Sequence, residues 1–130
     1  MGEKTVPSLD EWIREAKENP SAENCGMFLF HNGVVRATAR QQVREGKEAP
    51  PVKGMLFESN PFLAEEARMD TLSMDGIEYA RVWLNRGELS VGDDIMLVLI
   101  GGDTRPHVVE ALQYLVTRLK KECVKEVEQF

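Results

Sequence analysis

The chain is poor in the residue types that build metal centres and disulfide frameworks. It has 2 cysteines and 2 histidines among its 130 residues, and Cys25 and Cys123 stand far apart. Structural zinc sites need clustered Cys and His ligands, so we expect no zinc site here. A disulfide is the weaker alternative to two free thiols, and we expect no bound metal or cofactor.

The chain also lacks an apolar leader and any apolar run long enough to cross a bilayer, which favours a cytoplasmic protein. Excess positive charge is missing as well, because the net charge is -6 and the pI is near 5.0. Nucleic acid and membrane are therefore not expected as partners. An anionic ligand would require a local cluster of Arg and Lys that overcomes the global charge.

What is present fits a single α+β domain over residues 1–130, with a mixed or largely antiparallel sheet and flanking helices. Its 42% hydrophobic residues suffice for one core. The expected elements are a helix that begins with the Ser8–Glu11 capping box, strands within 25–37, 52–58, 77–84 and 95–100, a helix after Asn60-Pro61, and a final helix from about Asp103 through Lys125.

Two segments leave alternatives open. The Asn32-Gly33 pair closes a hairpin or forms a bulge within one long strand. Residues 38–51 form the longest stretch without an apolar pattern, and we expect an exposed, mobile loop there. Its Arg40, Arg44 and Lys47 close over an anionic ligand, or the segment is merely a tolerated surface insertion.

Several side chains are candidates for chemistry, each with a plainer alternative. The Gly101–Arg105 segment leads from a strand into a helix N-terminus, where free amides favour anions. Arg36 and Arg105 suit phosphate or carboxylate, although surface ion pairs are the commoner use of arginine. The two histidines, His31 and His107, fit structural or surface roles better than catalytic ones. The lysines near the end of the last helix complement its dipole.

The order of several short motifs resembles the large, catalytic subunit of molybdopterin synthase. The segment Cys25–Arg36 resembles a strand of that family that ends in Gly-x-Val-Arg, and Val52–Glu58 is similar to its second strand. Residues Gly87–Asp93 look like its Gly-x-Leu-x-Val-Gly-acidic turn. Thr104-Arg105 and Arg118–Lys120 follow in the family's order, so the resemblance spans about residues 8–126.

The resemblance implies an α/β hammerhead-type fold and a homodimer. It further implies a small ubiquitin-like sulfur-carrier subunit as partner, whose C-terminal Gly-Gly thiocarboxylate enters the active site. The implied reaction adds two sulfurs to cyclic pyranopterin monophosphate and forms the dithiolene of molybdopterin. Both ligands are anionic, so a pocket of Arg and Lys is what they require.

Matched by position, the resemblance also implies site residues. The catalytic residues would be Lys120 and Lys125, and the substrate-binding residues would be Arg36, Thr104, Arg105 and Lys121. Lysine serves in such a site as a proton donor or a transient covalent acceptor.

The chain departs from the family pattern at several of these positions. Thr104 stands where the family has His, and Leu84-Asn85 replaces a His-Arg pair. Val127 occupies the position of the second lysine, so Lys125 would have to substitute for it. The departures favour a non-catalytic relative that binds a carrier protein or a pterin, whereas the retained basic residues favour the enzyme. An unrelated α+β dimer is a third hypothesis.

Overall fold

Two antiparallel sheets of three strands each form the frame of the molecule, with strand orders β1-β5-β3 and β4-β2-β6. The computed structural model describes residues 5–130. Its elements are α1 (Leu9–Glu18), the 3-10 turn η1 (Pro20–Asn24), β1 (Met27–Val34), α2 (Arg40–Glu45), β2 (Gly54–Ser59), α3 (Pro61–Leu72), β3 (Ile77–Leu84), β4 (Gly87–Ser90), β5 (Asp94–Gly102), α4 (Arg105–Arg118), the π-helical turn η2 (Leu119–Cys123) and β6 (Val124–Gln129).

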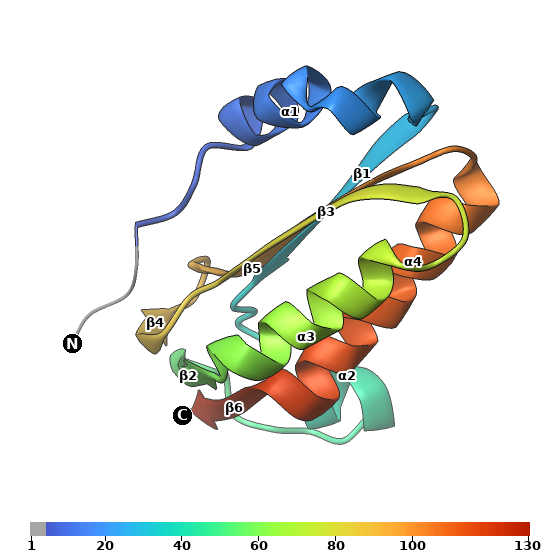
Figure 1. Ribbon diagram of the computed structural model, residues 1–130. Helices are drawn as coiled ribbons and strands as arrows, with labels where there is room; N and C mark the ends of the chain where they lie inside the picture. The colour runs from blue at the N-terminus through green and yellow to red at the C-terminus, as the bar shows by residue number, and fades with distance from the viewer. Residues whose placement is uncertain (1–4) are drawn as a thin grey trace.

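Helices cover both faces of the β1-β5-β3 sheet. Figure 1 shows α3 and α4 side by side on one face and α1 on the other. The central strand β5 is buried on both faces, which explains its uninterrupted apolar sequence. Its Met96, Val98 and Ile100 face α3 and α4 and belong to the main core. Its Leu97 and Leu99 face the other way and form a second cluster with Trp12 and Ala16 of α1.

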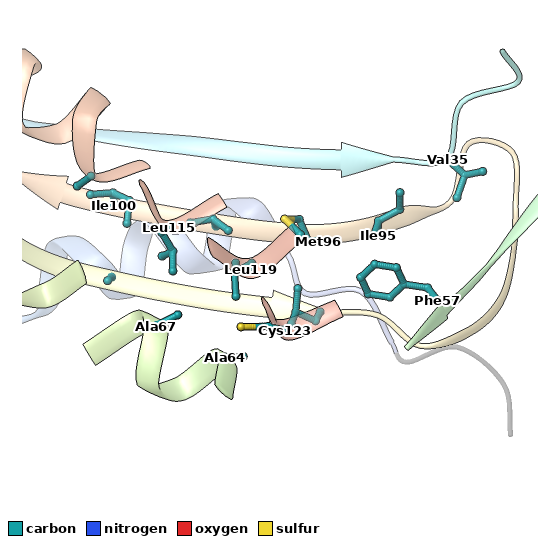
Figure 2. Packing of buried hydrophobic residues seen from close by; sticks show 14 of the residues in the cluster. Val35, Phe57, Ala64, Ala67, Ile95, Met96, Ile100, Leu115, Leu119 and Cys123 are labelled. Carbon is teal, nitrogen blue, oxygen red and sulfur yellow. The ribbon is translucent and has the colours of Figure 1, made fainter. Parts of the chain in front are cut away.

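The main core continues to the end of α4 and holds the π-helical turn in place. Leu119 and Cys123 are 0% and 3% exposed and belong to the same cluster as Met96 and Ala67. Figure 2 shows both side chains directed between β5 and α3. Burial of these two residues fixes the orientation of the turn, and Lys120 therefore leaves it toward the solvent side.

The expected α+β class is confirmed, and so are several element boundaries. Strand β3 matches the predicted segment from Ile77 to Leu84. Asn32-Gly33 lies inside β1, where the register with β5 shifts between Gly33 and Val34, so the bulge is the correct alternative. The run Met27–Phe30 is apolar at every position, which predicts a strand buried on both faces, but it is half-buried because β1 is an edge strand that pairs only with β5.

The helix starts follow the predicted capping chemistry. The Ser8 hydroxyl accepts a hydrogen bond from the amide of Glu11 at 3.2 Å. The Asn60 side chain accepts from the amides of Phe62 and Leu63 at 3.0 and 3.1 Å. Helix α4 differs, because its N-cap residue Thr104 makes no side-chain capping hydrogen bond, and the Asp103 carboxylate accepts a hydrogen bond only from the amide of Thr104 itself.

Two segments differ from the prediction, and both concern the site described below. Residues 38–51 are not without secondary structure, because they contain α2, which ends at Gly46 in the left-handed conformation with φ 70°. The last helix does not continue to Lys125. It ends at Arg118, passes through the π-helical turn, and gives way to β6, which pairs antiparallel with β2.

Within residues 5–130 no helix is long and apolar enough to span a bilayer. In the same part of the chain, no three His, Cys, Asp or Glu side chains gather as a metal site would require.

Candidate functional site

A basic pocket lies where α2, β6 and the end of α4 meet. It consists of two adjoining hollows of about 350 and 100 Å³ that share Arg40, Arg44, Lys120 and Glu126. The other polar and charged residues that line it are Arg36, Thr117, Lys121 and Glu128. Five cationic side chains against two carboxylates make this pocket locally positive in a chain whose net charge is -6. An anionic ligand therefore finds a favourable field here.

Lys120 stands at the centre of the pocket and lines both hollows. Its side chain is 41% exposed, and its ammonium lies 3.6 Å from a carboxylate oxygen of Glu126. The neighbouring Leu119 is fully buried, so the turn holds the backbone of Lys120 while its ammonium reaches solvent. A lysine held in this way is available to an incoming ligand.

Arg36 enters the pocket from the end of β1. Val35, which is 2% exposed, anchors this stretch, because its amide donates to the carbonyl of Asp93 at 2.9 Å. The Nε of Arg36 donates to the carbonyl of Thr38 at 2.9 Å. That bond uses one of the guanidinium donors and leaves the others for a ligand.

Helix α2 is held to the pocket by β6. The backbone amide of Arg40 donates to Glu128 at 2.9 Å, and its guanidinium donates to Glu126 at 3.2 Å. Arg40 and Arg44 therefore face the same hollows as Lys120. The sequence had marked Arg40, Arg44 and Lys47 as residues that could close over an anionic ligand. Arg40 and Arg44 line the hollows, whereas Lys47 does not line them and pairs with Glu45 at 3.3 Å.

The predicted site residues divide between two ends of α4. Arg36, Lys120 and Lys121 line the basic pocket. Thr104 and Arg105 lie at the opposite end of this helix of 14 residues. A helix of that length spans about 20 Å, so these two residues do not reach the pocket of their own chain.

Strand β6 places the remaining candidate, Lys125, outside the pocket. Lys125 is opposite Glu58 of β2 and exposed, as is its neighbour Val127, which is 44% exposed. The alternate positions, Glu126 and Glu128, turn inward. The sequence-based interpretation missed both glutamates, because the two valines of Val124–Glu128 are three positions apart and show no apolar–polar alternation typical of a strand.

His31 lies near the same pocket. It is half-buried on β1, and burial together with the positive charge of Lys120 lowers the pKa of its imidazole below the ordinary value. Its imidazole therefore stays neutral down to a lower pH than that of an exposed histidine.

Comparison with known families identifies the family of the chain. The sequence pattern of the family described as MoaE protein matches residues 4–122, which is most of the chain. The chain belongs to the MoaE protein family. Membership in this family supports a role in molybdenum cofactor biosynthesis. A comparison with curated proteins found no match.

Solved structures share the fold of this family member. Molybdopterin synthase from Staphylococcus aureus matches with a TM-score of 0.72 at 17% identity, covering 95% of this chain and 86% of the other. A complex of subunits 1 and 2 of molybdopterin-converting factor from Helicobacter pylori matches with a TM-score of 0.65 at 18% identity, covering 95% and 79%. Molybdopterin cofactor biosynthesis protein E from Burkholderia multivorans matches with a TM-score of 0.71 at 15% identity, covering 96% and 86%.

Proposed function

We propose that this chain is the catalytic subunit of a molybdopterin synthase. In this proposal it transfers sulfur from a thiocarboxylated ubiquitin-like carrier to cyclic pyranopterin monophosphate and forms the molybdopterin dithiolene. The observation that carries the proposal is the basic pocket itself. A member of the MoaE protein family with an acidic overall charge concentrates five cationic side chains around two adjoining hollows, which suits an anionic carrier tail and a cyclic phosphate.

Each side chain has a proposed role. Arg36, Arg40, Arg44 and Lys121 hold the anionic groups and stabilise negative charge as it develops on the reacting atoms. The Lys120 amine acts on the terminal carbonyl of the carrier. Once the carrier sulfur has bonded to a carbon of the pterin, the amine either transfers a proton while water cleaves the resulting thioester or attacks the carbonyl itself. The carbonyl–sulfur bond then breaks, the sulfur stays on the pterin, and water releases the carrier as its carboxylate.

The carrier is a proposed partner with a specific basis. The matched structure from Helicobacter pylori is a complex of two subunits of molybdopterin-converting factor. The basic pocket opens beside α2, so an extended C-terminal tail would approach it between α2 and the end of α4. A tail ending in Gly-Gly is narrow enough to enter such a hollow, since glycine has no side chain.

A homodimer would bring Thr104 and Arg105 into the site. Because they lie about 20 Å from Lys120 along α4, we propose that they contribute to the pocket of a second copy. Mixed dimers test this idea. A dimer of one Lys120→Ala chain and one Arg105→Ala chain keeps one complete pocket and should recover activity that neither parent dimer shows. Sedimentation as a monomer at micromolar concentration would rule the arrangement out.

A second candidate function is a non-catalytic relative that binds a carrier or a pterin without turnover. The observation that favours it is the residue that β6 directs into the pocket, which is Glu126, a carboxylate that pairs with Lys120. The position at which the family pattern has a second lysine is Val127, and its side chain points to solvent.

Reconstitution separates the two candidates. Purified protein is mixed with thiocarboxylated carrier and cyclic pyranopterin monophosphate, and the dithiolene product is measured together with binding of the carrier and of the pterin. Product formation supports the enzyme. Binding of the carrier or the pterin without product supports the non-catalytic relative, and absence of binding and product would contradict the two proposals together.

A further inference from the structure

Glu126 and Glu128 are the two anionic side chains that line the basic pocket, and Glu126 is the one that pairs with Lys120 at its centre. Its side chain is 7% exposed, whereas the side chains of its two cationic partners, Lys120 and Arg40, are 41% and 48% exposed. One oxygen of the carboxylate lies 3.6 Å from the ammonium of Lys120, and the other accepts a hydrogen bond from the guanidinium of Arg40 at 3.2 Å. The carboxylate thus lies beneath two cations that face solvent.

A bound anionic ligand would contact the same two cations that Glu126 contacts. A phosphate or carboxylate group in the pocket would draw its stabilisation from the same ammonium and guanidinium groups. With Glu126 in place, part of their charge is already compensated from below. An incoming anion must share these cations with Glu126 or displace it.

We propose that Glu126 is a resident counter-ion that competes with the anionic ligand of the pocket and so sets its affinity. The proposal deepens the proposed function, on which it rests for the ligand's chemical class, by naming a residue that determines how strongly an anion is held. Because Glu126 also holds Arg40 of α2, release of that contact by a ligand would loosen α2 from β6 on this side.

A purely structural role for Glu126 makes the opposite prediction. If the carboxylate served only to position Lys120 and Arg40 for the ligand, its removal would scatter both cations and weaken anion binding. If it only fastened α2, then Glu128, which binds the amide of Arg40, would retain the helix, and anion binding would not change. Only the competing role predicts tighter binding after the charge is removed.

The test is calorimetric titration of the full chain with inorganic pyrophosphate at fixed ionic strength, which keeps screening constant. Glu126→Gln should bind pyrophosphate about tenfold more tightly than the wild type, a change of about 1.4 kcal/mol. Glu58→Gln is the matched control, because Glu58 is an exposed residue of the neighbouring strand β2 and its loss changes the net charge equally. The control should stay within about twofold of the wild type.

A second variant guards against a folding defect in the first. Glu126→Asp keeps the charge but withdraws it by about one carbon–carbon bond, so its affinity should fall between those of wild type and Glu126→Gln. Unchanged or weaker binding in both variants would overturn the proposal, as would equal tightening in Glu58→Gln or no pyrophosphate binding by any of these proteins. The titration uses neither carrier nor pterin, so its outcome is separate from that of the reconstitution assay.

Discussion

Leu119 and Lys120 are sequence neighbours with opposite roles, and substitution of each by alanine should separate stability from function. Leu119 is fully buried between β5 and α3, where replacement of leucine by alanine costs about 2–5 kcal/mol in unfolding free energy. Taking about 3 kcal/mol, the melting temperature of a chain of this size should fall by about 10 °C. Lys120 is 41% exposed and loses only its pairing with Glu126, so Lys120→Ala should cost within about 1 kcal/mol.

Urea denaturation followed by circular dichroism measures both values. With a slope of about 2 kcal/mol per molar urea, the midpoint of Leu119→Ala should fall by about 1.5 M, and that of Lys120→Ala by less than about 0.5 M. A Lys120→Ala variant as unstable as Leu119→Ala would mark Lys120 as a structural residue. A loss below about 1 kcal/mol in Leu119→Ala would refute the argument that this turn is anchored by the core.

Two histidines provide further predictions by NMR titration. In Lys120→Met the pKa of His31 should rise, yet remain below its ordinary value because burial is the larger cause; an unchanged pKa would place Lys120 away from His31. The hydrogen bond that His107 Nδ1 donates to the Asp103 carboxylate, at 2.7 Å, raises the pKa of His107, so Asp103→Asn should lower this pKa. The stabilisation from this pair is fully present below the unfolded pKa of about 6.5 and is lost as pH rises through the raised value. The stability difference between wild type and Asp103→Asn should therefore shrink from about pH 6 to pH 9, and a difference that grows over this range would contradict the assignment.

Elements with strong local signals could be predicted from the sequence, and those that depend on a distant partner could not. Strand β5 is buried on both faces, so its apolar run identified it. Strand β6 directly follows a helical pattern, and only its pairing with β2, some 70 positions earlier, makes it a strand. Helix α2 has 6 residues and no buried face, so no apolar periodicity marked it.

The candidate site divides in the same way. Lys120 and Arg36 were identified because family motifs place them, and the pocket brings both together. Glu126 was missed because its inward orientation depends on where the π-helical turn ends and on the register of β6. A change of one residue in that register would exchange Glu126 for Lys125 or Val127 on the inner face. The sequence alone did not determine this register.

The most direct test of the central claim is dithiolene formation by Lys120→Arg. Arginine keeps a positive charge in the pocket, but its guanidinium neither loses a proton near neutral pH nor acts as a nucleophile. We predict that Lys120→Arg binds the thiocarboxylated carrier with near wild-type affinity and forms no dithiolene from cyclic pyranopterin monophosphate. The matched control Lys125→Arg, on the outer side of β6, should form product at the wild-type rate. Wild-type product formation by Lys120→Arg would contradict the assignment of this pocket as the site of sulfur transfer.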